Sequence, residues 1–130
     1  MKNQIAIYLR LSLEDVDKRT NAVKDDSNSI ASQRLLINRH LDQTPMLCDL
    51  PRIEFCDDGF SGTNFDRPDF QRMIECAKRG EISCIVVKDL SRFGRDYLEV
   101  GDYLEHIFPF LGIRFKLSLI HISEPTRLLS

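Results

Sequence analysis

The stretch IAIYLRLS, residues 5–12, joins a short apolar run to a polar segment. A continuous apolar run is typical of a strand that is buried on both faces of a parallel sheet. Arg10 and Ser12 are two residues apart, so in an extended chain their side chains point the same way. Two interpretations are open here: an ordinary buried strand that enters a loop, or a strand end that delivers an arginine and a serine to a reactive site.

The composition fits one soluble globular domain, because 130 residues with 42% hydrophobic and 29% charged side chains can bury a single core. The net charge of −2 provides no overall attraction for nucleic acid, so any polyanion site must be local. The sequence contains neither an apolar stretch of membrane-spanning length nor a signal peptide, and its four cysteines lack CxxC spacing. We therefore expect a cytoplasmic protein with reduced thiols and no membrane partner.

Strand and helix patterns alternate outward from the opening strand. The expected strands are residues 4–9, 52–56, 82–87 and an apolar run from Ile113; the expected helices start near residue 30, at Pro68 and at Tyr97, and Pro109 stops the third. This β-α-β-α-β-α-β order predicts a three-layer α/β fold, in which a mainly parallel sheet of about four strands carries helices on both faces.

Gln33 lies on the apolar face of the helix expected from residue 30, together with Ile37 and Leu41. Two interpretations of this glutamine are open: it is a hydrogen-bonded core residue, or it is held toward a site. Residues 14–28, which precede this helix, are polar and show no periodicity. We expect a long mobile loop there.

Three polar segments fall at the expected carboxyl edge of the sheet, where α/β proteins place their sites: residues 10–12, 57–67 and 88–95. They contain four arginines, of which Arg92 and Arg95 share a face if their segment is helical. The planar guanidinium group binds phosphate oxygens in pairs, so this set favours a phosphodiester site. The alternative is a solvated turn with surface Arg–Asp pairs, each worth about 0–1 kcal/mol.

A serine beside several arginines favours nucleophilic attack on a phosphodiester. The three polar segments contain no histidine, which argues against a Ser-His-Asp hydrolase. The sequence also lacks the GxxxxGK[ST] motif, which argues against an enzyme that uses nucleoside triphosphates. A serine nucleophile whose transition state is stabilised by guanidinium groups needs neither metal nor cofactor, and we expect neither.

Four motifs, in order along the chain, resemble those of the serine recombinases, the resolvase/invertase family. The residues of these motifs are most similar to those of the large serine recombinases of mobile elements. The resemblance extends over about residues 3–115. The motifs are YLRLS at residues 8–12, SIASQ at 29–33, DDGFSG at 57–62 with DRP at 66–68, and KDLSRFGR at 88–95. The resemblance implies a resolvase-like α/β domain.

The resemblance also implies a reaction. The serine would attack a DNA phosphate, form a 5′-phosphoserine link and free a 3′-hydroxyl, which later reverses the attack without ATP or metal. The matching catalytic residues are Ser12, Arg10, Arg67, Arg92, Arg95 and Gln33, and those expected at the DNA are Tyr8, Lys88 and Ser91. Many members carry an aspartate where this chain has Ser91, and a serine there resembles the large subfamily.

Partners follow from the same resemblance: double-stranded DNA, and a homodimer or tetramer of the full-length protein on paired DNA sites, with no nucleotide. The parent protein would integrate or excise a mobile element in a bacterial cytoplasm. The family pattern ends after Phe115, so we expect residues 1–116 to be a C-terminally truncated catalytic domain that is inactive in recombination by itself. Residues 117–130 resemble the in-frame translation of a transposase-end sequencing adaptor, and we expect a non-native tail; a divergent native tail is the alternative.

Two other functions stand as hypotheses. One is a non-catalytic domain that binds DNA or a recombinase partner, and the presence of Ser12 and all four arginines argues against it. The other is a small phosphate-ester hydrolase on a similar sheet. The lack of a catalytic cysteine or metal-ligand motif argues against this second alternative.

Overall fold

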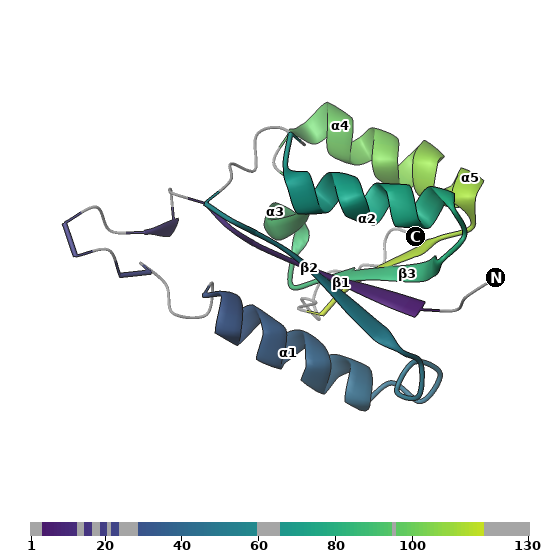
Figure 1. Cartoon of the computed structure of the whole chain (residues 1–130), viewed down its shortest axis with the longest axis horizontal. Coiled ribbons are helices and arrows are strands. Elements are labelled where there is room, and N and C mark those ends of the chain that lie inside the picture. Colours follow the sequence, from purple (N-terminus) through teal and green to yellow (C-terminus); the bar gives the residue numbers. More distant parts are fainter. Residues whose placement is uncertain are drawn as a thin grey trace, which may run out of the picture.

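The computed structural model describes residues 4–12, 15–16, 19–20, 22–23, 29–59, 66–94 and 96–118. They form a four-stranded sheet in the order β2-β1-β3-β4, in which every neighbouring pair is parallel. The strands are β1 (Gln4–Leu11), β2 (Arg52–Asp58), β3 (Ile82–Val87) and β4 (Arg114–Leu117). The predicted resolvase-like α/β architecture with a parallel sheet is confirmed (Figure 1).

Helices cover both faces of the sheet, with α1 on one face and α2, α4 and α5 on the other (Figure 1). The helical segments are α1 (Ile30–Asp42), α2 (Pro68–Lys78), α3 (Leu90–Phe93), α4 (Tyr97–Asp102), the π-helical η3 (Tyr103–Ile107) and α5 (Phe108–Leu111). Among the described residues, no helix has both the length and the apolar character needed to cross a membrane.

Side chains from the two faces of β1 pack into two different hydrophobic clusters. Ile5, Ile7 and Leu9 pack into a largely aliphatic cluster under α1. Ala6 and Tyr8 face the opposite way, into a larger cluster that is rich in aromatic rings and lies under α2. The alternation follows from the strand geometry, because successive side chains of a strand point to opposite faces.

The start of α1 agrees with the prediction. Ser29 is the N-cap, and its hydroxyl accepts a hydrogen bond from the Ser32 N–H at 3.1 Å. The buried positions of this helix are Gln33, Ile37 and Leu41, as the periodicity predicted.

Two elements near the carboxyl edge differ from the prediction. Strand β2 runs on to Asp58, because its last residues still pair with the end of β1, and Asp57 therefore lies opposite Arg10 rather than in a loop. The polar segment 88–95 contains the helix α3, and not merely the solvated turn that the sequence offered as the alternative. Asp89 caps this helix, since its carboxylate accepts the Arg92 N–H at 3.2 Å.

Pro109 does not stop the third helical region, contrary to the expectation. A proline inside a helix lacks an N–H and crowds the carbonyl group four residues earlier. The chain responds with a π-helical turn just before the proline, in which the Phe108 N–H donates to the Tyr103 carbonyl five residues back. The helical region then continues to Leu111 and ends at Gly112, which adopts a positive φ of 74°.

Several predictions concern residues outside the described ranges. These are most of the expected loop 14–28, residues 60–65, Arg95 and residues 119–130. In the described part of the loop, Asp15 is buried, and Val16 and Val23 form an isolated antiparallel bridge.

Candidate active site

The carboxyl end of β1 brings Ser12 against the carboxylate of Asp15. The Ser12 hydroxyl donates a hydrogen bond to Asp15 Oδ2 at 2.9 Å, and the Ser12 backbone N–H donates to the same oxygen at 2.9 Å. The Asp15 N–H donates in turn to the Ser12 carbonyl at 3.0 Å. Only 1% of Ser12 is exposed, so its hydroxyl is fixed inside a tight turn rather than presented to solvent.

Arg92 reaches the same carboxylate from α3. Its Nη1 donates to Asp15 Oδ2 at 2.9 Å, and its Nη2 donates to Asp15 Oδ1 at 3.3 Å. Nη1 also donates to the Arg10 carbonyl at 3.0 Å, which ties α3 to the end of β1. The Ser12 hydroxyl and the Arg92 guanidinium therefore converge on one anionic group.

Two opposing effects set the charge of Asp15. Burial by itself would raise the pKa of this carboxyl group, but hydrogen bonds from Arg92 and Ser12 outweigh it and hold the pKa of Asp15 well below its usual range. Asp15 is therefore ionised at neutral pH and forms a buried ion pair with Arg92. Removal of either partner would leave the other charge buried without compensation.

The guanidinium groups of Arg10 and Arg67 donate hydrogen bonds to backbone carbonyl groups of α3. Arg10 Nη2 donates to the Ser91 carbonyl at 2.6 Å, and Arg10 Nε donates to the Arg92 carbonyl at 3.1 Å. Arg67 Nη2 donates to the Phe93 carbonyl at 2.8 Å. The last carbonyl groups of a helix lack partners within the helix and carry partial negative charge, so these guanidinium groups stabilise α3 and fix its position.

A second buried network lies earlier along β1. The Tyr8 hydroxyl donates to Asp57 Oδ2 at 2.7 Å, and Arg67 Nη1 donates to the Tyr8 oxygen at 3.0 Å. The Asp57 carboxylate also accepts the N–H groups of Asp69 at 3.0 Å and Phe70 at 2.9 Å, so a residue of β2 caps α2. Burial raises the pKa of the Tyr8 hydroxyl far above its usual value, Arg67 opposes this shift, and Asp57 adds to it.

The side-chain amide of Gln33 forms two hydrogen bonds with the backbone of Arg10. Its Oε1 accepts the Arg10 N–H at 3.3 Å, and its Nε2 donates to the Arg10 carbonyl at 2.9 Å. A neighbouring strand would make the same pair of bonds, and here the pairing of β1 with β3 has already ended at Ile7. Gln33 is thus a hydrogen-bonded core residue that also supports the backbone two residues before Ser12.

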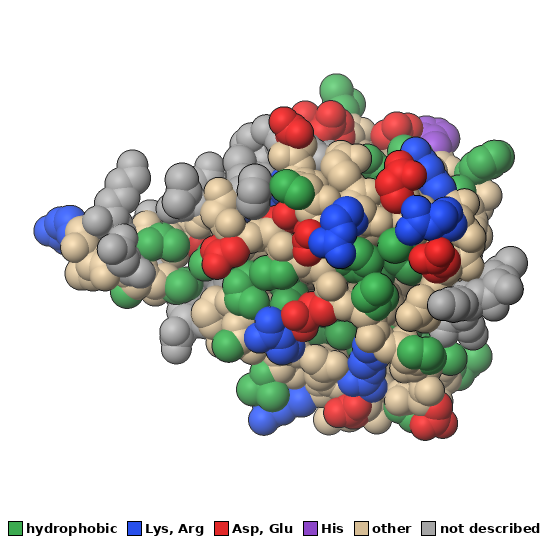
Figure 2. Space-filling view, viewed as in Figure 1, with side chains coloured by type: hydrophobic (Ala, Val, Ile, Leu, Met, Phe, Trp, Pro, Cys, Tyr) green, Lys and Arg blue, Asp and Glu red, His purple; other side chains and the backbone are tan. Residues whose placement is uncertain are grey.

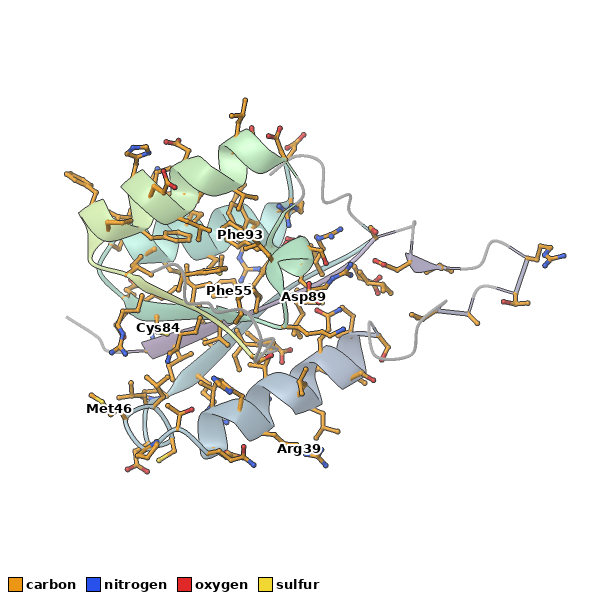
Figure 3. All side chains as sticks on the ribbon, turned by 180° about the vertical axis from the view of Figure 1, so that it is seen from behind. Arg39, Met46, Phe55, Cys84, Asp89 and Phe93 are labelled. Carbon is orange, nitrogen blue, oxygen red and sulfur yellow. The ribbon has the colours of Figure 1, made fainter. Side chains whose placement is uncertain are left out.

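The remaining predicted residues gather around Asp89. The Ser91 hydroxyl donates to Asp89 Oδ1 at 2.6 Å, and the buried Lys88 ammonium lies 3.8 Å from Asp89 Oδ2. Figure 3 shows Asp89 at the start of α3 and Phe93 toward the interior of the molecule. Every predicted site residue other than Arg95, which the structure does not describe, therefore lies near the carboxyl ends of β1 and β3. The described residues include no cluster of three or more potential metal ligands.

Sequence reasoning missed two acidic residues, Asp15 and Asp57. Asp15 belongs to a segment without periodicity, and its one local signal is the Ser12-x-x-Asp15 spacing, which suits a side chain that folds back onto a nearby N–H. Asp57 lies in a run of turn-forming residues. The signal for Asp57 is indirect. The side chain of Arg67, at the N-cap of α2, accepts no hydrogen bond from the first N–H groups of the helix, so another side chain must accept them.

A resolvase-like α/β domain is the class that the parallel sheet, its flanking helices and the buried serine–arginine cluster define. The family model described as the resolvase N-terminal domain matches residues 5–126. The chain therefore belongs to the serine recombinase catalytic domain family, enzymes of DNA strand exchange.

Solved structures share this fold at low sequence identity. The N-terminal catalytic domain of TP901-1 integrase matches with a TM-score of 0.70 and 22% identity, over 88% of this chain and 76% of that chain. The C-terminal catalytic domain of ISC1926 TnpA, an IS607-like serine recombinase, has a TM-score of 0.65 and 16% identity, over 97% and 75%. A serine recombinase from Sulfolobus solfataricus has a TM-score of 0.65 and 21% identity, over 95% and 73%. No curated protein sequence matches the chain with significance.

Proposed function

We propose that this chain carries the catalytic centre of a site-specific recombinase in which Ser12 attacks a phosphodiester of double-stranded DNA. The proposal rests on the convergence of the Ser12 hydroxyl and Arg92 Nη1 on a single anionic oxygen, each at 2.9 Å. A site that holds a carboxylate between a nucleophile and a guanidinium has the chemistry to hold a phosphate. Membership in the resolvase family supports DNA as the phosphodiester.

In the proposed reaction, Ser12 Oγ forms a bond to phosphorus while the bond from phosphorus to the 3′-oxygen of the preceding nucleotide breaks. The hydroxyl proton leaves Ser12, and the departing oxygen takes up a proton to become a 3′-hydroxyl. The product is a 5′-phosphoserine link. After strand exchange, the 3′-hydroxyl of the other DNA end attacks the same phosphorus and releases Ser12, so one phosphodiester replaces another without an energy source.

The contacts of the described residues suggest roles for four of the predicted side chains. Arg92 would balance the charge that develops on the phosphate oxygens. Arg10 and Arg67 would act as positioning residues, because their guanidinium groups hold the carbonyl groups of α3, which carries Arg92. Gln33 would support the Arg10 backbone. Direct phosphate contacts by Arg10, Arg67 and Arg95, and contacts of Tyr8, Lys88 and Ser91 with DNA, stay predictions from the family resemblance.

We also propose that the full-length protein acts as a homodimer or tetramer that integrates or excises a mobile element, and that the 130-residue chain alone does not recombine DNA. The net charge of −2 supports this division, because DNA binding draws most of its affinity from basic contacts with phosphates. On the face shown in Figure 2, acidic and basic side chains are interspersed rather than gathered into a basic surface. In this proposal the catalytic domain ends at residue 116, and residues 117–130 are a non-native tail.

A trapping experiment tests the chemistry. The full-length protein that carries this domain is incubated with a nicked suicide DNA substrate, which prevents religation, and the covalent adduct is quantified on a denaturing gel. We expect an adduct with the native protein and none with Ser12→Ala. Ser83→Ala is the matched control: Ser83 is half-buried near the opposite end of the sheet, where its hydroxyl donates to the Gln4 carbonyl at 3.4 Å, and its adduct should equal that of the native protein.

Two outcomes would reject the proposal. An undiminished adduct in Ser12→Ala would remove Ser12 as the nucleophile. DNA binding without any adduct from the native protein would favour the non-catalytic binding domain instead.

A further inference from the structure

The proposed nucleophile Ser12 and the neighbouring Arg92 are both buried in this structure. Ser12 is 1% exposed and Arg92 is 2% exposed, and between them lies the carboxylate of Asp15. Both oxygens of Asp15 accept from Arg92, and one of them also accepts from the Ser12 hydroxyl. A DNA phosphate that is to be attacked by Ser12 and bound by Arg92 needs the space and the donors that Asp15 now uses.

We propose that Asp15 is an internal competitor for the DNA phosphate: its carboxylate occupies the phosphate position between Ser12 and Arg92, and it must leave before DNA can bind. This inference rests on the proposed function, because it takes Ser12 and Arg92 as the groups that meet the phosphate. The chemical match is close, since a carboxylate and a phosphodiester each present two oxygens that share a negative charge to a guanidinium fork.

The hydrogen bonds of Arg92 support the same conclusion. Arg92 Nη1 and Nη2 donate to Asp15, and Nη1 donates also to the Arg10 carbonyl, whereas Arg92 Nε is buried and no hydrogen-bond partner is found for it among the described residues. The nearest ion-pair oxygen to Nε, Asp89 Oδ1, is 4.0 Å away. A buried donor without a partner is unusual in a folded protein. The guanidinium is therefore satisfied only in part by Asp15, as expected if its proper ligand is an anion that arrives from outside.

An alternative role for Asp15 is to receive the proton of Ser12 during attack. The geometry permits this, because the hydroxyl already donates to Asp15 Oδ2. However, the same carboxylate is engaged in a bidentate pair with Arg92, and this pair makes it a weak proton acceptor. The position of Asp15 also conflicts with a phosphate on Arg92, whereas a general base has to remain in place beside the bound substrate. The observations therefore favour competition.

Inorganic phosphate is the probe that tests this inference without requiring catalysis. The 130-residue chain, isotopically labelled, is titrated with phosphate, and binding is followed by the NMR signal of the Arg92 Nε–H. In Asp15→Asn we expect phosphate to bind about 10- to 100-fold more tightly than in the native chain, because the apparent affinity is the intrinsic affinity multiplied by the open fraction of the site, and an open fraction of about 1–10% gives this range.

Two further variants serve as controls. Asp42→Asn removes the same charge from an exposed carboxylate that pairs with Arg52 at 2.8 Å, and its phosphate affinity should stay at the native value. In the double variant Asp15→Asn/Arg92→Gln, the gain should vanish, because the phosphate loses its guanidinium. If Asp15→Asn does not fold, as judged by circular dichroism, Asp15→Ser removes the same charge and keeps a small hydroxyl acceptor for the Ser12 N–H.

The result that would overturn the inference is a folded Asp15→Asn or Asp15→Ser chain that binds phosphate no more tightly than the native chain. The adduct assay on the full-length protein separates this failure from that of the proposed function. If Asp15 is the proton acceptor, Asp15→Asn should lower adduct formation about 100-fold or more without any gain in phosphate affinity. If Ser12→Ala still forms an adduct, the proposed nucleophile is wrong, whatever the phosphate titration shows.

Discussion

On one side of β1, Ile7 and Leu9 pack into the aliphatic core under α1, where the contacts are not directional. On the other side, Tyr8, Arg10 and Ser12 are just as deeply buried, but each donates hydrogen bonds to defined partners. A single strand thus combines two kinds of interior. The first kind depends on side-chain volume, whereas the second tolerates only changes that leave no buried polar group unpaired.

The largest effect on stability is expected from breaking the buried charge pair on the polar side. Arg92→Met should lower the free energy of unfolding by about 3–5 kcal/mol, because Asp15 keeps its burial and loses its compensating charge. The exposed Arg72 provides the matched control: it also pairs with an aspartate, Asp69, at 2.5 Å, but its side chain is 69% exposed. Arg72→Met should cost about 0–1 kcal/mol. Equal losses in the two variants, measured by urea unfolding, would contradict the distinction.

The next effect compares the smallest possible deletions on the two sides. Tyr8→Phe removes one hydroxyl and leaves Asp57 and Arg67 without their shared partner, which should cost about 1–3 kcal/mol. Ile7→Val removes one methylene from the aliphatic core and should cost about 0.5–1.5 kcal/mol. Urea unfolding of the two variants side by side measures the difference. A Tyr8→Phe protein as stable as the native chain would show that the hydrogen bonds of the Tyr8 hydroxyl do not contribute to the free energy of unfolding.

At acid pH, protonation of Asp15 should lower the free energy of unfolding by a smaller amount than these substitutions. The folded-state pKa of Asp15 lies below the value of about 3.9 expected in the unfolded chain, so its contribution is complete above that pH and is lost as the pH falls. Between about pH 5 and pH 3, the native chain should lose about 1 kcal/mol more stability than Asp15→Asn. Urea unfolding at each pH provides the measurement, and Asp42→Asn should follow the native slope. Parallel slopes for the native chain and Asp15→Asn would show that Asp15 is not held ionised by Arg92.

The aliphatic side of the molecule could be predicted well from sequence. Apolar runs predicted the strands, and the helical spacing predicted the buried positions Gln33, Ile37 and Leu41. This success has a simple cause: burial by packing leaves a local period in the sequence. The π-helical turn before Pro109 was missed because a proline normally ends a helix, and the apolar period does not record a local change to a hydrogen bond that spans five residues.

The polar side could be predicted only in part. The arginine and serine residues were expected at the sheet edge, since parallel strands place their carboxyl ends together. Their partners were not, because Arg10 and Ser91 are 81 residues apart and meet through a backbone carbonyl, which no side-chain pattern records. Asp57 was likewise left outside the expected strand 52–56, although its carboxylate accepts hydrogen bonds from Tyr8 and from the start of α2. Networks between distant segments need the folded chain before they can be identified.

The most direct test of the central claim is to locate the covalent bond between protein and DNA. The adduct trapped from the full-length protein on a suicide substrate is digested with protease and nuclease, and the modified peptide is sequenced by tandem mass spectrometry. We predict a 5′-linked nucleotide on the hydroxyl of Ser12 and a free 3′-hydroxyl on the released DNA strand. A nucleotide on any other residue, or a 3′-phosphate link, would contradict the assignment of Ser12 as the nucleophile.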